Sequence, residues 1–334
     1  MSGDVSLSTR PAQAKPSLWA RIVDNRDLLA LPAMFIIALL IFSLASDKFL
    51  TTGNLTNVAR QSVYLLIVAL GQLVVMIGGG LDLSVGSNVS LTSVASSMVM
   101  AAIFAANPND PWFALWSGLA VGMAVGLAVG LVNGLGVTLL GINPFMMTLG
   151  MSSVVFGITL YIAGGVPIYG APPLHGEIFG FGKIAGFPIP SLVALALVVL
   201  AWFTLEWTRF GRHLYAAGGN GRAAELSGVR TVPVRIMAYM ICGLMASLAG
   251  LLLTARLGSG EANVGASLPL ESIAACVISG VNLAGGRGRA LAVVMGTLLI
   301  LLVQNGLNLM QVGAYAQSIA TGGILIFAMA IVRR

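Results

Sequence analysis

Residues 113–140 read FALWSGLAVGMAVGLAVGLVNGLGVTLL and contain no charged side chain. A transmembrane helix needs about 20 consecutive, mostly apolar residues, so this stretch can cross a bilayer as one helix. Every fourth position in its middle part is glycine, namely Gly118, Gly122, Gly126, Gly130 and Gly134. Residues four apart lie on one helix face, and a face without side chains lets a second helix approach closely. We expect this face to pack against a helix of the same chain, with a subunit or gating interface as the alternative.

The composition of the whole chain agrees with a membrane protein. Of its 334 residues, 57% are hydrophobic and only 8% are charged, whereas a soluble domain has about 25% charged residues. Most of the surface must therefore face lipid, where every backbone polar group needs a partner within the protein and only helices or a closed barrel can span. Long unbroken apolar runs favour helices over a barrel. The sequence thus predicts an all-α protein, a polytopic transmembrane helical bundle.

The apolar runs predict about ten spans. They cover residues 28–46, 63–80, 85–106, 113–140, 144–164, 190–206, 236–255, 271–284, 290–309 and 313–332. If residues 1–27 form a cytoplasmic tail and 28–334 the membrane domain, 13 of the 17 Lys and Arg residues fall on the cytoplasmic side, as the positive-inside rule requires. Both termini are then cytoplasmic. The net charge of +6 is explained by this topology, and nucleic acid is not an expected partner.

Residues 78–86, GGGLDLSVG, are the first candidate for a functional segment. The glycines break a helix and allow backbone angles that other residues avoid, and Asp82 and Ser84 can cap the next helix. One interpretation is a capped helix break at the cytoplasmic interface. Because an acid inside a membrane is a functional candidate by default, the other is a gating element formed by Gly79, Gly80, Asp82, Ser84 and Gly86. Residues 278–286, ISGVNLAGG, repeat part of this pattern and have Asn282 in place of Asp82.

The long basic segment at residues 207–235 is the second candidate. From Asn220 onward it reads as a short helix that Gly228 closes as a C-terminal cap. A connector exposed to water needs no such pattern, whereas a docking surface for a cytoplasmic partner does. The residues of this surface are Gly218, Gly219, Asn220, Arg222, Ala223, Ala224, Glu225, Leu226, Ser227 and Gly228. The basic turn at residues 285–289, GGRGR, is interpreted as a positive anchor on the same side.

Eight amide side chains inside or beside the apolar runs are candidates for lining a solute pathway. They are Gln72, Asn88, Asn133, Asn143, Asn282, Gln304, Asn305 and Asn308. Amides can hydrogen-bond sugar hydroxyls without burying a charge, but they can equally hold helices together, and the sequence does not separate these uses.

The chain is not expected to be an enzyme, to bind a metal or to need a cofactor. It has no catalytic cluster and no phosphate-binding loop of the form G-x-x-x-x-G-K-[ST]. Cys242 and Cys276 lie inside apolar runs without nearby metal ligands. We expect both to be small buried side chains.

Three segments of the chain resemble a known family. The runs GGLDLSVG (79–86), GGNGRAAELSG (218–228) and LAGGRGR (283–289) are similar, in kind and order, to the permease subunits of bacterial ABC importers of the ribose/xylose/arabinose type. In that family the large cytoplasmic loop carries an EAA-x-x-x-G element that docks onto the ATPase subunit. Ala223, Ala224 and Gly228 match this element. Its acidic position is Arg222 here, and Glu225 supplies a carboxylate only on a different helix face.

The resemblance implies a permease of the bacterial inner membrane that moves a monosaccharide or related polyol while separate subunits hydrolyse ATP. It implies a periplasmic sugar-binding protein that delivers the solute near residues 165–189, and a second permease chain, either a copy or a paralogue. ATP binding would then act through residues 211–230.

Two alternatives remain beside this importer. One is an ATPase-independent secondary transporter or channel for a small polar solute, and the lack of a chain of buried acids argues against ion coupling. The other is a membrane-embedded enzyme, which would need a catalytic cluster.

Overall fold

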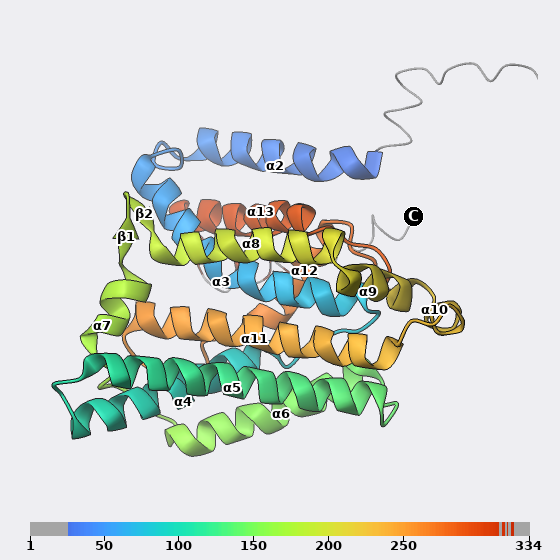
Figure 1. Ribbon diagram of the computed structural model, residues 1–334. Coiled ribbons are helices and arrows are strands. Elements are labelled where there is room, and N and C mark those ends of the chain that lie inside the picture. The colour runs from blue at the N-terminus through green and yellow to red at the C-terminus, as the bar shows by residue number, and fades with distance from the viewer. Residues whose placement is uncertain (1–25, 314–315, 318, 320–321, 324–334) are drawn as a thin grey trace, which may run out of the picture.

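The computed structural model describes residues 26–313, 316–317, 319 and 322–323, and this part of the chain is almost entirely helical (Figure 1). The helices long and apolar enough to cross a membrane are α3 (Thr52–Ile77), α4 (Val85–Ala106), α5 (Pro111–Thr138), α6 (Pro144–Ala163), α8 (Ile189–Trp207), α11 (Thr231–Leu257) and α13 (Ala290–Leu309). Two helices contain shorter apolar stretches, namely α2 (Arg26–Ala45) and α12 (Leu268–Ile278). The predicted polytopic helical bundle is therefore confirmed.

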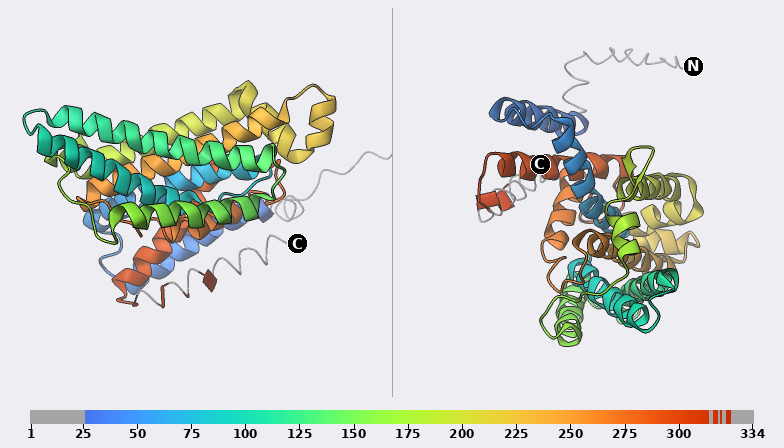
Figure 2. Two further views of the ribbon diagram at one scale, coloured as in Figure 1. Left: turned by 90° about the horizontal axis from the view of Figure 1, so that it is seen from below. Right: turned by 90° about the vertical axis from the view of Figure 1, so that its left-hand side faces the viewer.

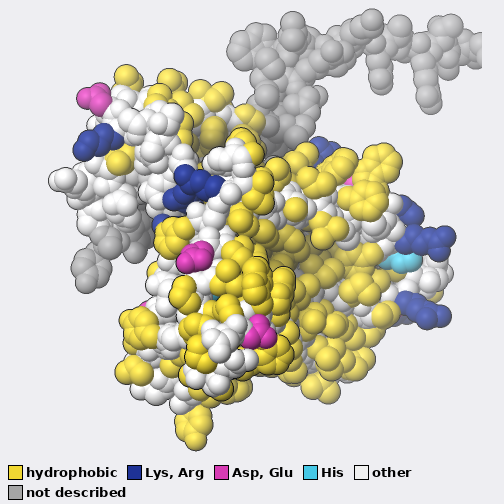
Figure 3. All heavy atoms as spheres, turned by 60° about the vertical axis from the view of Figure 1, so that its left-hand side comes forward, with side chains coloured by type: hydrophobic (Ala, Val, Ile, Leu, Met, Phe, Trp, Pro, Cys, Tyr) yellow, Lys and Arg dark blue, Asp and Glu magenta, His cyan; other side chains and the backbone are white. Residues whose placement is uncertain are grey.

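The remaining elements lie at the two ends of the bundle (Figure 1). At one end are α7 (Pro173–His175), the π-helix η1 (Gly176–Gly180) and an antiparallel hairpin of β1 (Lys183–Ile184) and β2 (Phe187–Pro188). At the other end are α9 (Arg209–Gly219) and α10 (Gly221–Leu226). We call this second end, which carries the arginines of α9, α10 and the turn before α13, the basic end. Figure 3 shows hydrophobic side chains across the middle of one face, flanked by charged side chains toward the ends.

Helix α3 forms the centre of the bundle. Its residues from Ser62 to Ile77 are all buried, and α8, α11, α12 and α13 pack around it. Helix α2 lies at the edge, where Phe42 packs in a separate cluster with α13 (Figure 2). Helix α3 begins eleven residues before the predicted span at 63–80, because its first turns carry polar residues such as Asn54 and Asn57 that end an apolar run.

The glycine face of α5 packs within the chain. A Cβ placed on Gly130 would lie 2.8 Å from the Met240 Cα in α11, and one on Gly122 would lie 3.0 Å from the Thr92 side chain in α4. Atoms of real side chains almost never approach so closely. The stripe therefore lets α5 contact α4 and α11 at backbone distance, as expected for small residues between membrane helices.

The predicted span at 271–284 is wrong in length. Helix α12 has only 11 residues, which is about 16 Å of helix at 1.5 Å per residue and roughly half of a bilayer core. Pro269 lies in its first turn, and Gly280, with φ of 80°, follows its last turn. The predicted tenth span at 313–332 and the tail at 1–27 lie mostly outside the described residues.

Candidate functional site at the basic end of the bundle

Helix α3 ends in a tight break rather than in a solvent loop. Gly79, with φ of 81°, follows its last turn, and the Gly80 N–H donates to the Val75 carbonyl at 3.0 Å. Only glycine adopts this left-handed backbone conformation without a steric penalty. The chain then turns back beside α11, where the Tyr239 hydroxyl donates to the Leu81 carbonyl at 3.3 Å. The segment 78–84 is thus a discontinuity between α3 and α4 within the bundle.

Asp82 is the buried centre of this break. Its Oδ1 accepts hydrogen bonds from the Ser84 N–H at 2.9 Å and from the Ser84 hydroxyl at 2.6 Å. The Asn133 amide of α5 donates to the Ser84 Oγ at 2.7 Å. The Gln72 side-chain amide of α3 pairs with the backbone of Asp82. Its nitrogen donates to the Asp82 carbonyl at 3.1 Å, and its oxygen accepts from the Asp82 N–H at 3.2 Å. Four predicted candidates therefore meet in one network that fixes α4 to α3 and α5, namely Gln72, Asp82, Ser84 and Asn133.

The other predicted amides have separate positions. Asn88 donates to the Gly243 carbonyl of α11 at 3.2 Å. Asn305 and Asn54 exchange two hydrogen bonds of 2.9 Å between α13 and α3. Asn143 accepts from the Phe145 N–H as the cap of α6. These contacts join or cap helices, and a pathway role for these residues stays a prediction.

Three further amides lie in the turn between α12 and α13 and along α13. Asn282 accepts from the Ala284 N–H in the turn before α13. Gln304 donates to Glu271 of α12 at 3.2 Å, and Asn308 is exposed one turn further along α13. Glu271 was not among the predicted residues, although an acid inside an apolar run was a usable signal.

Helices α9 and α10 form most of the segment 207–235 that is predicted to dock a cytoplasmic partner, and we call residues 209–228 the coupling segment. The Asn220 side chain accepts from the Ala223 N–H at 3.0 Å and so caps α10. Gly228, with φ of 83°, follows α10, and the Val229 N–H returns to the Ala224 carbonyl at 3.0 Å. This glycine-containing C-terminal cap is the one expected from the sequence.

Helix α10 presents one face to its neighbours and one outward. Ala224 is buried, whereas Leu226 is 85% exposed. The other exposed residues among the predicted docking residues are Gly219, Asn220, Arg222, Ala223, Glu225, Ser227 and Gly228. The Glu225 carboxylate accepts a hydrogen bond from the Thr231 hydroxyl at the start of α11. The outward face therefore combines one cation with an apolar side chain, and its acid is tied to α11.

The coupling segment packs directly on the break after α3. A Cβ on Gly218 would overlap the Ile77 carbonyl, and one on Gly285 would lie 2.8 Å from the Gly79 Cα. The Gly286 N–H donates to the Ile77 carbonyl at 2.9 Å. We call this contact of Ile77, Gly79, Gly218, Gly285 and Gly286 the glycine junction. It brings together the three segments that the sequence singled out separately.

One tyrosine and one arginine donate hydrogen bonds next to the glycine junction. The Tyr215 hydroxyl of α9 donates to the Gly288 carbonyl at 2.7 Å. Arg235 of α11 donates through Nη2 to the Ala217 carbonyl of α9 at 2.9 Å. Neither residue was predicted, because a single Tyr or Arg near a helix end has no distinctive sequence pattern.

The repeat between residues 78–86 and 278–286 has a structural counterpart. Gly79 and Gly280, with φ of 81° and 80°, follow the last turns of α3 and α12. Asp82 and Asn282 each accept a hydrogen bond from the N–H two residues later. Gly79 and Gly280 are 201 residues apart, whereas Asp82 and Asn282 are 200 apart. The second copy therefore has one residue fewer between the glycine and the polar side chain.

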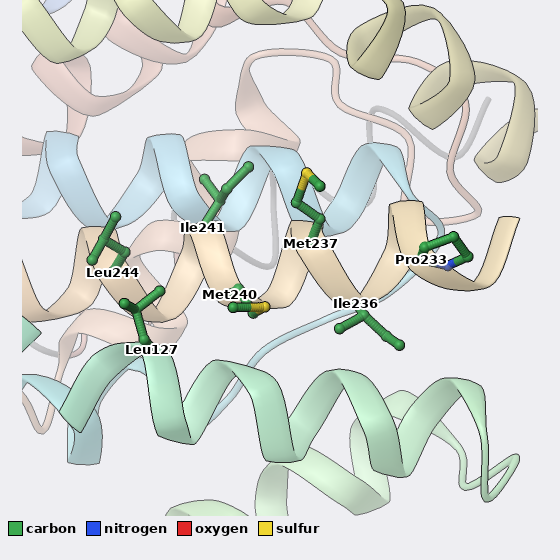
Figure 4. Close-up of a pocket in the computed structure, with 7 residues that line it drawn as sticks. All are labelled: Leu127, Pro233, Ile236, Met237, Met240, Ile241 and Leu244. Atoms are coloured by element: carbon green, nitrogen blue, oxygen red, sulfur yellow. The ribbon is translucent and has the colours of Figure 1, made fainter. Parts of the chain in front are cut away.

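An apolar pocket of about 400 Å³ lies between α5 and α11 (Figure 4). It is lined by Leu127, Pro233, Ile236, Met237, Met240, Ile241 and Leu244. These side chains offer no hydrogen-bonding group to a polar solute. The pocket is therefore unsuited to a hydrophilic ligand.

Comparison with known proteins agrees with these features. Residues 54–331 match the family described as "Branched-chain amino acid transport system / permease component". The ribose import permease protein of Bacillus subtilis (strain 168) is 38% identical over 89% of this chain and 90% of that protein. The D-allose transport system permease protein of Escherichia coli (strain K12) is 36% identical over 98% and 97%.

The galactose/methyl galactoside import permease protein of Salmonella typhimurium is 34% identical over 89% of this chain and 91% of that protein. No solved structure matches the chain. Because both the family match and these relatives extend over most of the sequence, the chain belongs to this family of permease components, and it is a multi-pass transport protein of the bacterial inner membrane rather than an enzyme.

Proposed function

We propose that this chain is the membrane-spanning subunit of an ATP-driven importer for a monosaccharide or related polyol. The similarity to ribose, allose and galactose permeases over most of the chain carries this proposal. Separate cytoplasmic subunits hydrolyse ATP, and a periplasmic sugar-binding protein delivers the solute. A second permease chain completes the pathway.

The basic end faces the cytoplasm in this proposal. Lys and Arg concentrate on the cytoplasmic side of membrane proteins, and Arg209, Arg212, Arg222, Arg287 and Arg289 belong to this end. The opposite end, with α7 and the β1–β2 hairpin, then faces the periplasm and the binding protein. Helix α2 also begins at the basic end and runs parallel to α13 (Figure 1), with Phe42, late in α2, against Gly306, late in α13, so the orientation gives α2 a cytoplasmic start.

Helix α10 docks onto the ATPase subunit through its outward face. Leu226 projects from the segment with 85% of its surface exposed, and burial of such a side chain would contribute about 1.5–3 kcal/mol to association. A movement of α10 passes to α9 and then to Ile77 and Gly79, because the glycine junction leaves no side chain between them. ATP binding thereby acts on the break between α3 and α4.

Co-purification tests this proposal. The tagged chain is isolated from its native membrane, and the ATPase activity of the recovered complex is measured with and without sugar-loaded binding protein. We expect an ATPase subunit to be recovered and its activity to be stimulated, and Leu226→Asp to lose the subunit while Leu257→Asp, at the opposite end of α11, retains it. Recovery of the intact chain without any ATPase would contradict the proposal.

A further inference from the structure

The chain between α11 and α12 does not leave the bundle but runs back along α4. The Glu261 N–H donates to the Ser93 hydroxyl at 3.1 Å, and the Gly265 N–H donates to the Ser90 hydroxyl at 3.2 Å. Gly260 packs against Ser97, and Gly265 packs against the backbone of Gly86. From Ser97 to Gly86 the helix rises about 16 Å. The segment 259–267 therefore descends through about half of the bilayer in irregular conformation.

This irregular segment has an outward side that lipid cannot cover. Asn263, Ala266 and Ser267 are exposed, and irregular backbone at membrane depth is tolerated only where it is buried in protein or lines a water-filled cavity. The side of the bundle formed by this segment and the start of α12 must accordingly meet water or another protein surface.

Glu271 lies on the same side, in the first turn of α12. Its carboxylate accepts a hydrogen bond from the Gln304 amide at 3.2 Å, and it is only partly buried. Gln304 follows the start of α13 by 14 residues, which places it about 21 Å along that helix from the basic end. Glu271 is thus an acid at membrane depth, where a charged side chain is costly and marks solute or ion pathways.

The Asp82 carboxylate differs from that of Glu271 in its burial and its hydrogen bonds. It is fully buried and accepts hydrogen bonds from Ser84 and Asn133, so it has a structural task. Glu271 retains free acceptor capacity, since the described protein gives it one amide donor and the neighbouring Ser267 side chain.

A polar strip extends from Glu271 in both directions. Ser267 precedes it by four residues on the same side, and Asn308 follows Gln304 by four residues, so each pair shares a helix face. Asn263 continues the strip along the irregular segment. We define the polar strip as Asn263, Ser267, Glu271, Gln304 and Asn308.

We propose that Glu271, oriented by Gln304, contacts the transported solute directly and that the polar strip lines its path. This inference rests on the proposed sugar transport. An ionised carboxylate only accepts hydrogen bonds, and its two oxygens can accept from two neighbouring hydroxyls of one sugar. The Gln304 amide and the Ser267 side chain orient the carboxylate, whose remaining lone pairs are available to the sugar, and Asn308 can both donate and accept.

Uptake kinetics of the assembled transporter test the role of Glu271. We expect Glu271→Gln, which keeps the shape and removes the charge, and Glu271→Ala to lower sugar uptake at least tenfold at limiting concentration. ATPase activity stimulated by the binding protein should persist, because Glu271 lies far from the basic end. Ser272→Ala, at the buried neighbouring position, should transport normally. Normal uptake by both Glu271 variants, or equal loss of uptake, yield and ATPase activity, would overturn the inference.

Thiol labelling tests whether the strip lines the path. In a Cys242→Ala/Cys276→Ala background, we expect Ser267→Cys to react with a small charged methanethiosulfonate reagent during ATP turnover, and Ser272→Cys to stay unreactive. Sugar-loaded binding protein should slow the reaction at Ser267→Cys. A position inert in every state, or one that sugar does not protect, would assign this side to a protein interface instead. Sugar uptake by the parent transporter separates this outcome from failure of the proposed function.

Discussion

The backbone N–H of Gly286 donates to the carbonyl of Ile77 at 2.9 Å and joins the turn before α13 to the last residue of α3. The same carbonyl lies against Gly218 of the coupling segment. One peptide group at the end of the most buried helix thus contacts both of the other segments at the basic end. Any force on α9 must reach this carbonyl, because no side chain separates the two backbones.

Gly218→Ala tests the junction, and Gly219→Ala is its matched control. A Cβ on Gly218 would overlap the Ile77 carbonyl, whereas the nearest atom to a Cβ on Gly219 is the Gly286 Cα at 3.9 Å. Overpacking of this kind costs about 1–3 kcal/mol. We expect Gly218→Ala to reduce ATP-driven uptake and lower the unfolding temperature, and Gly219→Ala to change neither. Equal behaviour of the two variants would refute the close contact.

Gly126→Leu should disrupt folding more than Leu127→Ala. Gly126 packs against Gly243 and Ser247 of α11, with no space for a side chain. Leu127 is 36% exposed and lines the apolar pocket between α5 and α11. We expect a destabilisation of about 3 kcal/mol or more for the first variant, at the upper end of overpacking, and a small effect for the second. The yield of monodisperse protein in mild detergent measures the difference, and similar yields would contradict the packing.

Asp82→Ala should destabilise the break between α3 and α4. It leaves the Ser84 N–H without its acceptor, and a buried unsatisfied group costs about 1–3 kcal/mol. Asp82→Asn retains an oxygen acceptor and should cost less. Thermal unfolding in detergent measures both, with the exposed helix cap Asp110→Asn as a control. An Asp82→Ala protein as stable as the parent would show that the network does not hold the break.

His175 should make the end of the bundle opposite the basic end sensitive to acid. Burial lowers the pKa of this histidine from 6.5 to about 4, and its contact with the Leu251 backbone opposes the shift only in part. Between these values the unfolded segment binds a proton that the folded segment excludes, so stability falls as the pH drops from 6.5 toward 4 and is unaffected above 6.5. A shift of this size corresponds to about 3 kcal/mol.

His175→Asn checks this expectation. Asparagine can still donate to the Leu251 carbonyl but does not take up a proton in this range. Limited proteolysis of the segment 165–189 at pH 4.5 and 7.5 should show acid-induced cleavage in the parent and much less change in the variant. The same pH dependence in both proteins would assign the effect to other groups.

Much of the helical arrangement could be predicted from residue patterns. Apolar runs located most of the long helices, because lipid demands such runs. The short helix after Asn220 and its C-terminal cap at Gly228 were predicted from local chemistry, which acts over a few residues. The glycine stripe of α5 predicted a close helix contact, and the structure identifies its partners as α4 and α11.

Features that depend on contacts between distant residues were not predicted. The half-length of α12 follows from hydrogen bonds between the preceding segment and Ser90 and Ser93 of α4. The glycine junction requires three turns to converge on Ile77, and no local pattern encodes that meeting. Tyr215 and Arg235 contribute single hydrogen bonds to distant carbonyls, which leave no periodic signal.

ATP-driven uptake by proteoliposomes tests the central claim most directly. The chain is reconstituted with the ATPase subunit and the sugar-binding protein recovered with it, and uptake of labelled ribose, allose and galactose is followed. We predict that at least one sugar accumulates only with ATP on the side of the basic end and with binding protein on the opposite side. Accumulation by the chain alone, without ATP, would contradict the account and identify an ATPase-independent transporter.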